Sequence, residues 1–201
     1  MTERPIIFNG DMVRAILRGE KTQTRRPVKP QPDRAPASVS PLQMFDDARW
    51  RSWKCPFGEP GDRLWVRETF ALGEPPYFGV AYRADEGDNP EDVGGERQKW
   101  TPSIHMPRYL SRITLEITDI NAERVQDITE DDARAEGVKP EFRTVVARSD
   151  GGPDYHIPCS YRGGFANTWD AIYAKRPGLS WDENPWIWAI TFRRVESSHG
   201  G

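Results

Sequence analysis

Hydrophobic residues along the chain recur mostly at strand spacing, in short runs separated by polar stretches. Residues 111–126 alternate apolar and polar side chains, which predicts a long strand with one solvated face. Residues 63–70 form the clearest strand, although apolar groups lie on both of its faces at the start. Residues 185–192 are nearly all apolar, as is typical of a central strand in a well-covered sheet. Short apolar runs at 5–8 and 79–83 predict two further strands.

Three segments are predicted as short helices. The first follows Asn9, a good N-cap residue, has apolar side chains at helical spacing and ends at Gly19. The second, over 127–137, contains the Thr-x-x-Asp sequence of a capping box with aspartate in place of glutamate. The third covers 165–175, with aromatic residues along one face.

Three stretches show little periodicity and are predicted as loop insertions, at about 28–60, 84–107 and 139–163. The count is then about six strands and three short helices. Loops rather than regular crossover helices separate the strands, which argues against a parallel α/β fold. The pattern therefore predicts an α+β fold that is mainly β. We expect a small barrel or a curled antiparallel sheet in a single domain over residues 1–201.

The charged residues are unevenly distributed along the chain, although the net charge is small. The formal net charge of −3 argues against a protein that coats nucleic acid by electrostatics. Between positions 11 and 34, however, seven basic residues stand against three acidic ones, whereas positions 85–96 hold six acidic residues and no basic one. One basic surface on an acidic protein suits a small anionic ligand or a single nucleotide better than a long duplex.

The two cysteines, Cys55 and Cys159, lie far apart and form no Cys-x-x-Cys motif. The chain thus offers no zinc or redox motif, and we expect free thiols, no metal and no cofactor. The N-terminus lacks the apolar core of a signal peptide, and no apolar run reaches membrane-spanning length. These features predict a soluble, cytoplasmic protein without a membrane partner.

The densest candidate chemistry lies in residues 19–26, Gly-Glu-Lys-Thr-Gln-Thr-Arg-Arg, directly after the first predicted helix. A lysine amine beside a threonine hydroxyl is a possible pair of base and nucleophile, here Lys21 and Thr24. Strand alternation puts these two on opposite faces, so their convergence requires a bulge or turn. The alternative is a solvated basic turn, because charge runs mostly face water.

Three other polar positions have ordinary structural interpretations. Glu68 and its neighbour Arg67 lie where a strand leaves the core, and a structural ion pair is the default expectation. His105 has no serine or cysteine nucleophile motif around it, so a packed or hydrogen-bonded role is favoured over catalysis. Glu136 lies on the last turn of a short helix, where the dipole slightly disfavours a carboxylate, and the residues alone predict solvated surface.

Several motifs in this order resemble the ASCH domain family. They are the Gly-x-Lys-Thr-x-Thr-x-Arg segment after a helix, Pro-Gly-Asp-Arg-Leu-Trp-Val-Arg, a long strand feeding Ala-Arg-Ala-Glu-Gly, and a terminal apolar strand. The segments Cys-Pro-Phe-Gly-Glu-Pro-Gly-Asp and Asn-Pro-Trp-Ile-Trp are similar to the longer ASCH proteins carried by phages and prophages. The resemblance runs from residue 5 to residue 195, except at the tips of the insertions. It implies a PUA-like β-barrel related to RNA-binding modules.

The best-defined enzymes of that family are small amidohydrolases that deacetylate N4-acetylcytidine. By resemblance, their catalytic lysine, threonine and glutamate fall on Lys21, Thr24 and Glu136, and their arginine falls on Arg26. The resemblance thus reverses the expectation for Glu136. The minimal enzymes are about half as long as this chain, so the added loops bear on which substrate is used.

This resemblance implies a hydrolase acting on an N4-acylated cytosine nucleoside or a related modified base. We expect Arg25, Arg26, Glu68 and Trp65 to contribute to substrate binding, with an aromatic ring stacking on the pyrimidine. Two alternatives stay open. One is a PUA-like module that binds modified or single-stranded nucleic acid without turnover, and it would use basic residues for phosphates. These residues are Arg14, Arg18, Arg25 and Arg26. The other alternative is a ribonuclease.

Overall fold

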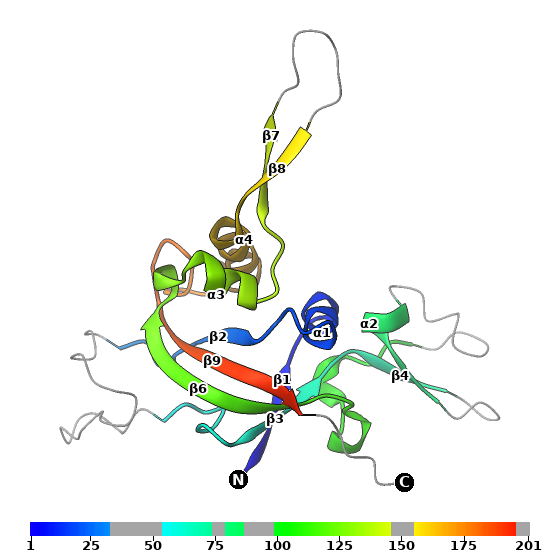
Figure 1. The fold of residues 1–201 in the computed structure, drawn as a ribbon. Helices are drawn as coiled ribbons and strands as arrows, with labels where there is room; N and C mark the ends of the chain where they lie inside the picture. Colours follow the sequence, from blue (N-terminus) through cyan, green and yellow to red (C-terminus); the bar gives the residue numbers. More distant parts are fainter. Residues whose placement is uncertain (33–53, 74–78, 87–98, 146–154, 196–201) are drawn as a thin grey trace, which may run out of the picture. The chain divides into compact units, whose positions relative to one another are not determined.

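The computed structural model describes residues 1–32, 54–73, 79–86, 99–145 and 155–195 (Figure 1). They form a mixed α+β fold that is mostly sheet, with a few short helices. One mixed sheet has the strand order β1-β3-β6-β9-β2. Its strands are β1 (Glu3–Ile7), β3 (Arg63–Arg67), β6 (Thr114–Arg124), β9 (Trp186–Val195) and β2 (Gln23–Pro27). Strand β1 runs parallel to β3, and β3 runs antiparallel to β6.

This strand order is open among the described residues, with β1 and β2 at its two ends, so no closed barrel is seen there. The element content confirms the prediction of an α+β fold that is mainly β. Within the described residues, no helix is long and apolar enough to cross a membrane.

The chain divides into two compact units. The first comprises Met1–Gly19, Phe45–Ile120 and Thr191–Gly201, and the second comprises Glu20–Met44 and Asn121–Ile190. The long strands β6 and β9 contribute residues to both.

Helix α1 (Gly10–Leu17) of the first unit begins and ends where the sequence predicts. The Asn9 side chain accepts a hydrogen bond from the Met12 backbone N–H at 2.9 Å, so Asn9 is the N-cap. Gly19 has φ 75°, the left-handed conformation that glycine adopts readily just past a helix end. This unit also contains the elements β4 (Phe70–Leu72), β5 (Val80–Tyr82), α2 (Arg83–Glu86), η2 (Ser103–His105) and η3 (Arg108–Leu110).

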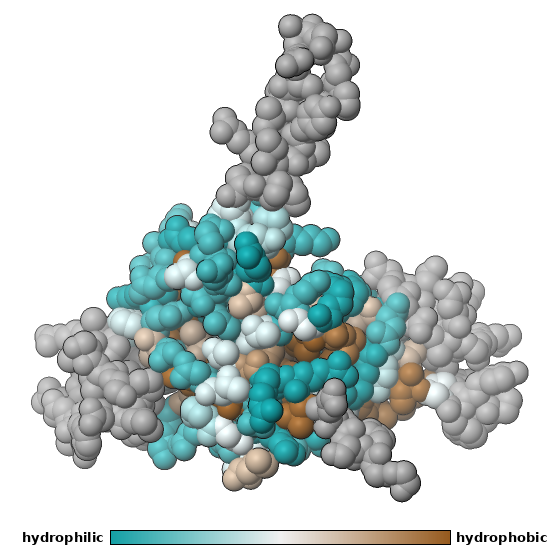
Figure 2. Space-filling view, viewed as in Figure 1, coloured by the Kyte–Doolittle hydropathy of each residue, from teal (hydrophilic) through white to brown (hydrophobic). Residues whose placement is uncertain are grey.

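The second unit is organised around the helices α3 (Glu130–Ala135) and α4 (Tyr161–Tyr173), preceded by η4 (Val125–Asp127). Its buried core contains Val125, Ile128, Ala133, Phe165, Trp169, Tyr173, Leu179, Ile187 and Ala189. The Trp169 indole N–H is satisfied inside this core, because it donates to the Leu179 carbonyl at 2.8 Å. Hydrophilic residues cover the surface around α3 in the view of Figure 2.

The structure has more strands than the pattern predicts. Nine strands lie within the described residues, where about six are expected, and four α-helices replace the expected three. The predicted loop over 139–163 is wrong in part, because β7 (Glu141–Val145) and β8 (Tyr155–Ser160) pair antiparallel as a ribbon. Backbone hydrogen bonds between two strands need no apolar alternation, so the sequence pattern gave no sign of them. Most of the predicted insertion at 28–60 lies outside the described residues.

Helix α3 carries the predicted capping box. The Thr129 side chain accepts from the Asp132 N–H at 3.1 Å, and the Asp132 carboxylate accepts from the Thr129 N–H at 3.4 Å. Glu136 is the C-cap, with its N–H bonded to the Asp132 carbonyl, and Gly137 follows at φ 72°. Both ends of this six-residue helix are therefore fixed by local sequence, and with them the backbone position of Glu136.

We predict that Thr129→Ala lowers the free energy of unfolding by about 1 kcal/mol, because the first turn of α3 loses its cap. Urea denaturation followed by circular dichroism measures this change. Thr118→Ala is the matched control, since Thr118 is exposed on β6 and caps no helix. An equal loss in both variants would show that the cap contributes nothing specific.

Candidate active site

Lys21 belongs to the second unit and lies in the short segment that precedes β2. Strand β2 begins only at Gln23, so Lys21 and Thr22 precede it and strand alternation does not apply to Lys21. The Thr22 N–H donates to the Ala135 carbonyl at 2.8 Å and ties this connection to the end of α3. Strand alternation therefore does not place Lys21 and Thr24 on opposite faces, and their convergence stays a prediction.

Lys21 is buried, with 2% of its surface exposed. Its Nζ donates to the Glu136 carboxylate Oε2 at 2.7 Å, to the Glu136 backbone carbonyl at 2.8 Å and to the Gln23 carbonyl at 2.8 Å. Three acceptors match the three N–H groups of an ammonium, so this arrangement holds Lys21 in its protonated form. A solvated basic turn is therefore the wrong description of this segment.

Glu136 is also buried, with 3% of its surface exposed, so the surface position expected from its helix end is wrong. Its Oε2 pairs with Lys21, and its Oε1 lies 3.4 Å from Nη1 of Arg25. The left-handed Gly137 ends the helix at this residue, and long-range contacts with the β2 segment then enclose the carboxylate. Local sequence contains no sign of these contacts, and only the family resemblance pointed to Glu136.

The environment lowers the pKa of Lys21 below its ordinary value of 10.5. Burial is the main cause, because it penalises the charged form. The nearby guanidinium groups of Arg26 and Arg25 act in the same direction, whereas Glu136 acts against them. The proton of the Lys21 ammonium is thus easier to remove than that of an ordinary surface lysine.

Arg25 is the second buried cation of the unit, with 5% of its surface exposed. Its Nε and Nη2 lie 3.0 and 2.9 Å from Oε1 of Glu123, and its Nη1 lies 3.0 Å from Oε1 of Gln23. Besides the contact with Glu136, Nη2 lies 3.6 Å from Oδ2 of Asp132. The guanidinium also lies 5.9 Å from the ring centroid of Phe165.

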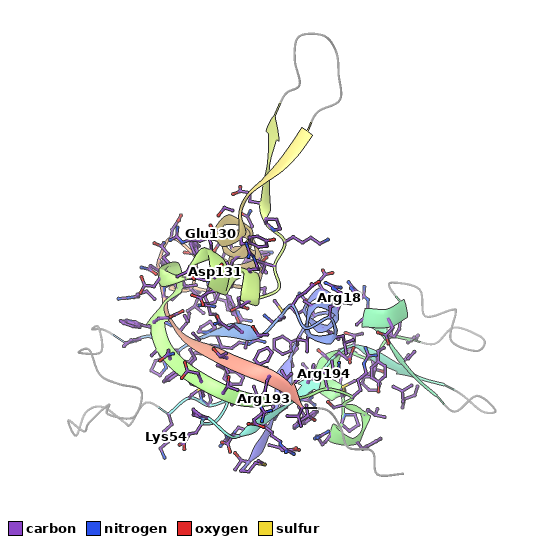
Figure 3. All side chains as sticks on the ribbon, viewed as in Figure 1. Arg18, Lys54, Glu130, Asp131, Arg193 and Arg194 are labelled. Carbon is purple, nitrogen blue, oxygen red and sulfur yellow. The ribbon has the colours of Figure 1, made fainter. Side chains whose placement is uncertain are left out.

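These groups form what we call the charge cluster: Lys21, Arg25, Glu123, Asp132 and Glu136. Figure 3 labels Glu130 and Asp131 on α3, the helix that also carries Asp132 and leads into Glu136. Burial raises the pKa of Glu123, although Arg25 opposes this change. Partial burial acts to raise the pKa of Asp132 as well, but hydrogen bonds from Thr129 and Gln23 leave it lowered. Three carboxylates and two cations give the charge cluster one excess negative charge when all are ionised.

Thr24 and Arg26 both lie on β2. Thr24 is buried and follows Gln23, so the Lys21 ammonium lies against the peptide group that leads into Thr24. Arg26 is half-buried. In the second unit Glu136 therefore contacts both Lys21 and Arg25, and Thr24 directly follows the carbonyl group to which Lys21 donates. An amine and a carboxylate in contact can exchange a proton, and together with a hydroxyl they make up a residue set that supports nucleophilic attack.

Glu68 and Trp65 belong to the first unit. Glu68 is buried and its carboxylate accepts two hydrogen bonds from Arg112, at 2.9 and 3.0 Å. The expected structural ion pair of Glu68 is thus present, but its partner is Arg112, whereas Arg67 donates to the Met106 carbonyl at 3.0 Å.

Trp65 is half-buried, with the guanidinium groups of Arg67 and Arg108 at 5.2 and 6.0 Å from its ring. Roles of Glu68 and Trp65 in substrate binding stay predictions.

The remaining candidates do not form a second site. His105 is exposed at the end of η2, and Cys55 is a free, half-exposed thiol. The side chain of Cys159 lies outside the described residues. No group of histidine, cysteine and carboxylate side chains in the described part of the chain is arranged to hold a metal ion.

Comparisons of the chain with protein-family models, with curated proteins and with solved structures give no match. The ASCH resemblance therefore rests on the sequence motifs alone, and the roles that it implies are proposals.

We predict that Lys21→Met or Glu136→Leu alone lowers the free energy of unfolding by about 3–5 kcal/mol, since each leaves one buried charge without its partner. The double variant should be destabilised by clearly less than the sum, because it removes both charges together. Chemical denaturation of the four proteins measures this coupling. Additive losses would mean that the two groups do not interact in the folded protein.

We also predict a specific pH dependence of stability from Lys21. Between its lowered pKa in the folded protein and 10.5, the unfolded chain binds a proton that the folded chain has released. The free energy of unfolding contributed by Lys21 therefore rises with pH in this window, by at most about 1.4 kcal/mol per pH unit. Denaturation of the wild type and Lys21→Met from pH 7 to pH 10 isolates this contribution. A difference that stays constant with pH would contradict the lowered pKa.

Proposed function

We propose that this protein is an amidohydrolase that removes the acyl group from an N4-acylated cytosine nucleoside or a related modified base. The observation that carries the proposal is the buried pair of Lys21 and Glu136, with the Lys21 ammonium against the peptide group of the predicted nucleophile Thr24. Burying an ion pair costs desolvation free energy that an apolar pair avoids. Buried titratable groups with shifted pKa values are typical of catalytic sites.

In the proposed first step, Lys21 acts as the base. Its lowered pKa allows the amine to lose a proton to solvent, which gives up one of its three hydrogen bonds. The bond to the Gln23 carbonyl is the one next to Thr24 in the chain, and we propose that its loss frees the nitrogen lone pair for the threonine hydroxyl. The neutral amine then takes the hydroxyl proton as Thr24 Oγ1 attacks the acyl carbonyl carbon.

In the second step, Glu136 moves this proton to the leaving group. The Lys21 ammonium passes it across the 2.7 Å contact to the Glu136 carboxylate, which delivers it to N4 as the C–N bond breaks. The free amine of cytosine departs, and the acyl group stays on Thr24 as an ester. Water then attacks the ester with Lys21 as base, which releases the carboxylic acid and returns the proton to Thr24.

Arg26 is assigned to orienting the base or to stabilising the oxyanion of the tetrahedral intermediate. This role rests on the Lys-Thr-x-Thr-x-Arg motif and on the half-buried position of Arg26 beside Arg25 on β2.

We further propose that the five-stranded sheet is a PUA-like fold. The order of the described strands is open, so support for the finer fold comes from the sequence motifs.

A binding module without catalysis has less support. That alternative uses Arg14, Arg18, Arg25 and Arg26 for phosphates. Of these, Arg14 pairs with Asp11 at 2.7 Å and donates to the Ala84 carbonyl. Arg25 is buried among carboxylates. Both this alternative and the ribonuclease are outcomes that the following assay separates.

We predict that the purified protein releases cytidine and acetate from N4-acetylcytidine, measured by liquid chromatography over a panel of N4-acylated cytidines and deoxycytidines. Lys21→Ala and Thr24→Ala should each lower kcat by about a hundredfold or more, because they remove the base and the nucleophile. Thr24→Ser keeps a hydroxyl and should retain part of the activity.

Arg193→Met is the control, since Arg193 is exposed on β9 and pairs only at the surface with Glu116. Full activity of Thr24→Ala would exclude Thr24 as the nucleophile. Salt-dependent binding of single-stranded RNA with no product would favour the binding module. Cleavage of labelled RNA in the presence of a metal chelator would favour the ribonuclease.

A further inference from the structure

Arg25 makes more polar contacts than the proposed reaction needs from it. The steps above use Lys21, Thr24 and Glu136, and none of them involves the guanidinium. Yet this side chain is buried and lies within 3.6 Å of three carboxylates, which is an expensive arrangement for a residue without a role. Its contacts also differ from those of a substrate-binding arginine, because its Nε, Nη1 and Nη2 all have protein partners.

We propose that Arg25 is a positioning residue that holds the Glu136 carboxylate in place for proton transfer. This inference rests on the proposed function. The two oxygens of Glu136 are held from two sides, Oε2 by Lys21 at 2.7 Å and Oε1 by Arg25 at 3.4 Å. A carboxylate held by only one oxygen can turn about its last side-chain bond. With both oxygens held, the plane of the carboxylate is fixed and Oε2 stays aligned with the Lys21 amine.

Arg25 is itself held by an outer layer of groups. Glu123 accepts from both Nε and Nη2, and the Gln23 side chain accepts from Nη1. The side chains of Glu123 and Asp132 are 27% and 32% exposed, whereas that of Arg25 is 2% exposed. The charge cluster thus runs from partly solvated carboxylates through Arg25 to the buried Glu136. The planar fork of arginine can serve both sides at once, which the single ammonium of a lysine cannot do.

A second effect follows from the positive charge. Arg25 is one of the groups that lower the pKa of Lys21, and it does so through the electrostatic effect of its charge. Removing this cation should therefore raise the pKa of Lys21, so that the neutral amine forms only at higher pH. A residue that merely supports the fold would not move this titration in a folded variant.

The test compares Arg25→Met, Arg25→Lys and the control Arg193→Met with the wild type. We expect Arg25→Met to lower kcat by about tenfold or more with KM within about threefold, because the proton carrier is misaligned while substrate contacts stay. The rising limb of its kcat–pH profile should move to higher pH. Arg25→Lys keeps the charge but loses the fork, so it should lower kcat with a smaller shift of the limb.

A measurement that needs no substrate distinguishes failure of the proposed amidohydrolase function from failure of the proposed role of Arg25. The titration of Lys21 is followed by NMR of its Nζ in 15N-labelled protein, and Arg25→Met should move it to higher pH, whereas Arg193→Met should not. If the wild type hydrolyses no substrate of the panel, the proposed function fails. The Lys21 titration then decides by itself whether Arg25 acts on the pair of Lys21 and Glu136.

The proposal is overturned if folded Arg25→Met keeps kcat within twofold of an active wild type, or if the Lys21 titration is unchanged. It is also overturned if Arg25→Met and Arg25→Lys both fail to fold, as judged by circular dichroism, since Arg25 would then serve stability alone. A raised KM with unchanged kcat would assign Arg25 to substrate contact instead.

Discussion

The second unit depends on one constraint, which is the enclosure of a lysine ammonium and a glutamate carboxylate away from water. A buried charge is tolerated only when its hydrogen bonds are satisfied. Lys21 meets this condition through one carboxylate oxygen and two backbone carbonyls. Two of these three acceptors belong to Glu136, so the end of α3 and the segment before β2 cannot separate without exposing both charges. The backbone bond from Thr22 to Ala135 reinforces the same junction.

Local devices make this junction possible. The capping box at Thr129 starts α3, and the left-handed Gly137 ends it directly after Glu136. Around the pair, Arg25 links the buried Glu136 to the partly solvated Glu123 and Asp132. Solvent exposure in the charge cluster therefore increases from Glu136 and Arg25 to Glu123 and Asp132, and each buried charge has more than one partner. Such a network holds the side chains in one orientation and stabilises their ionised forms, and both matter for proton transfer.

Sequence reasoning was most successful where local rules operate. The capped helix after Asn9, the capping box before Glu136 and the long strand β6 all follow from residue preferences and spacing. It failed where partners come from distant segments. The β7–β8 ribbon has no clear alternation, and Glu68 pairs with Arg112 rather than with its neighbour Arg67. Lys21 and Arg25 were equally compatible with a solvated turn, because nothing in eight residues shows which side chains will be covered.

The sequence by itself determined the mainly β character of the chain, the ends of α1 and α3, and the motif that singles out Lys21 and Thr24. These depend on capping, spacing and residue type, which act over a few positions. Only the tertiary structure decided that Lys21, Arg25 and Glu136 meet as the buried members of the charge cluster. Lys21 and Glu136 are 115 residues apart, and a contact at that separation arises from packing that no local pattern records. Burial then changes a surface lysine and a helix-end glutamate into a coupled pair, because desolvation acts only once the fold excludes water.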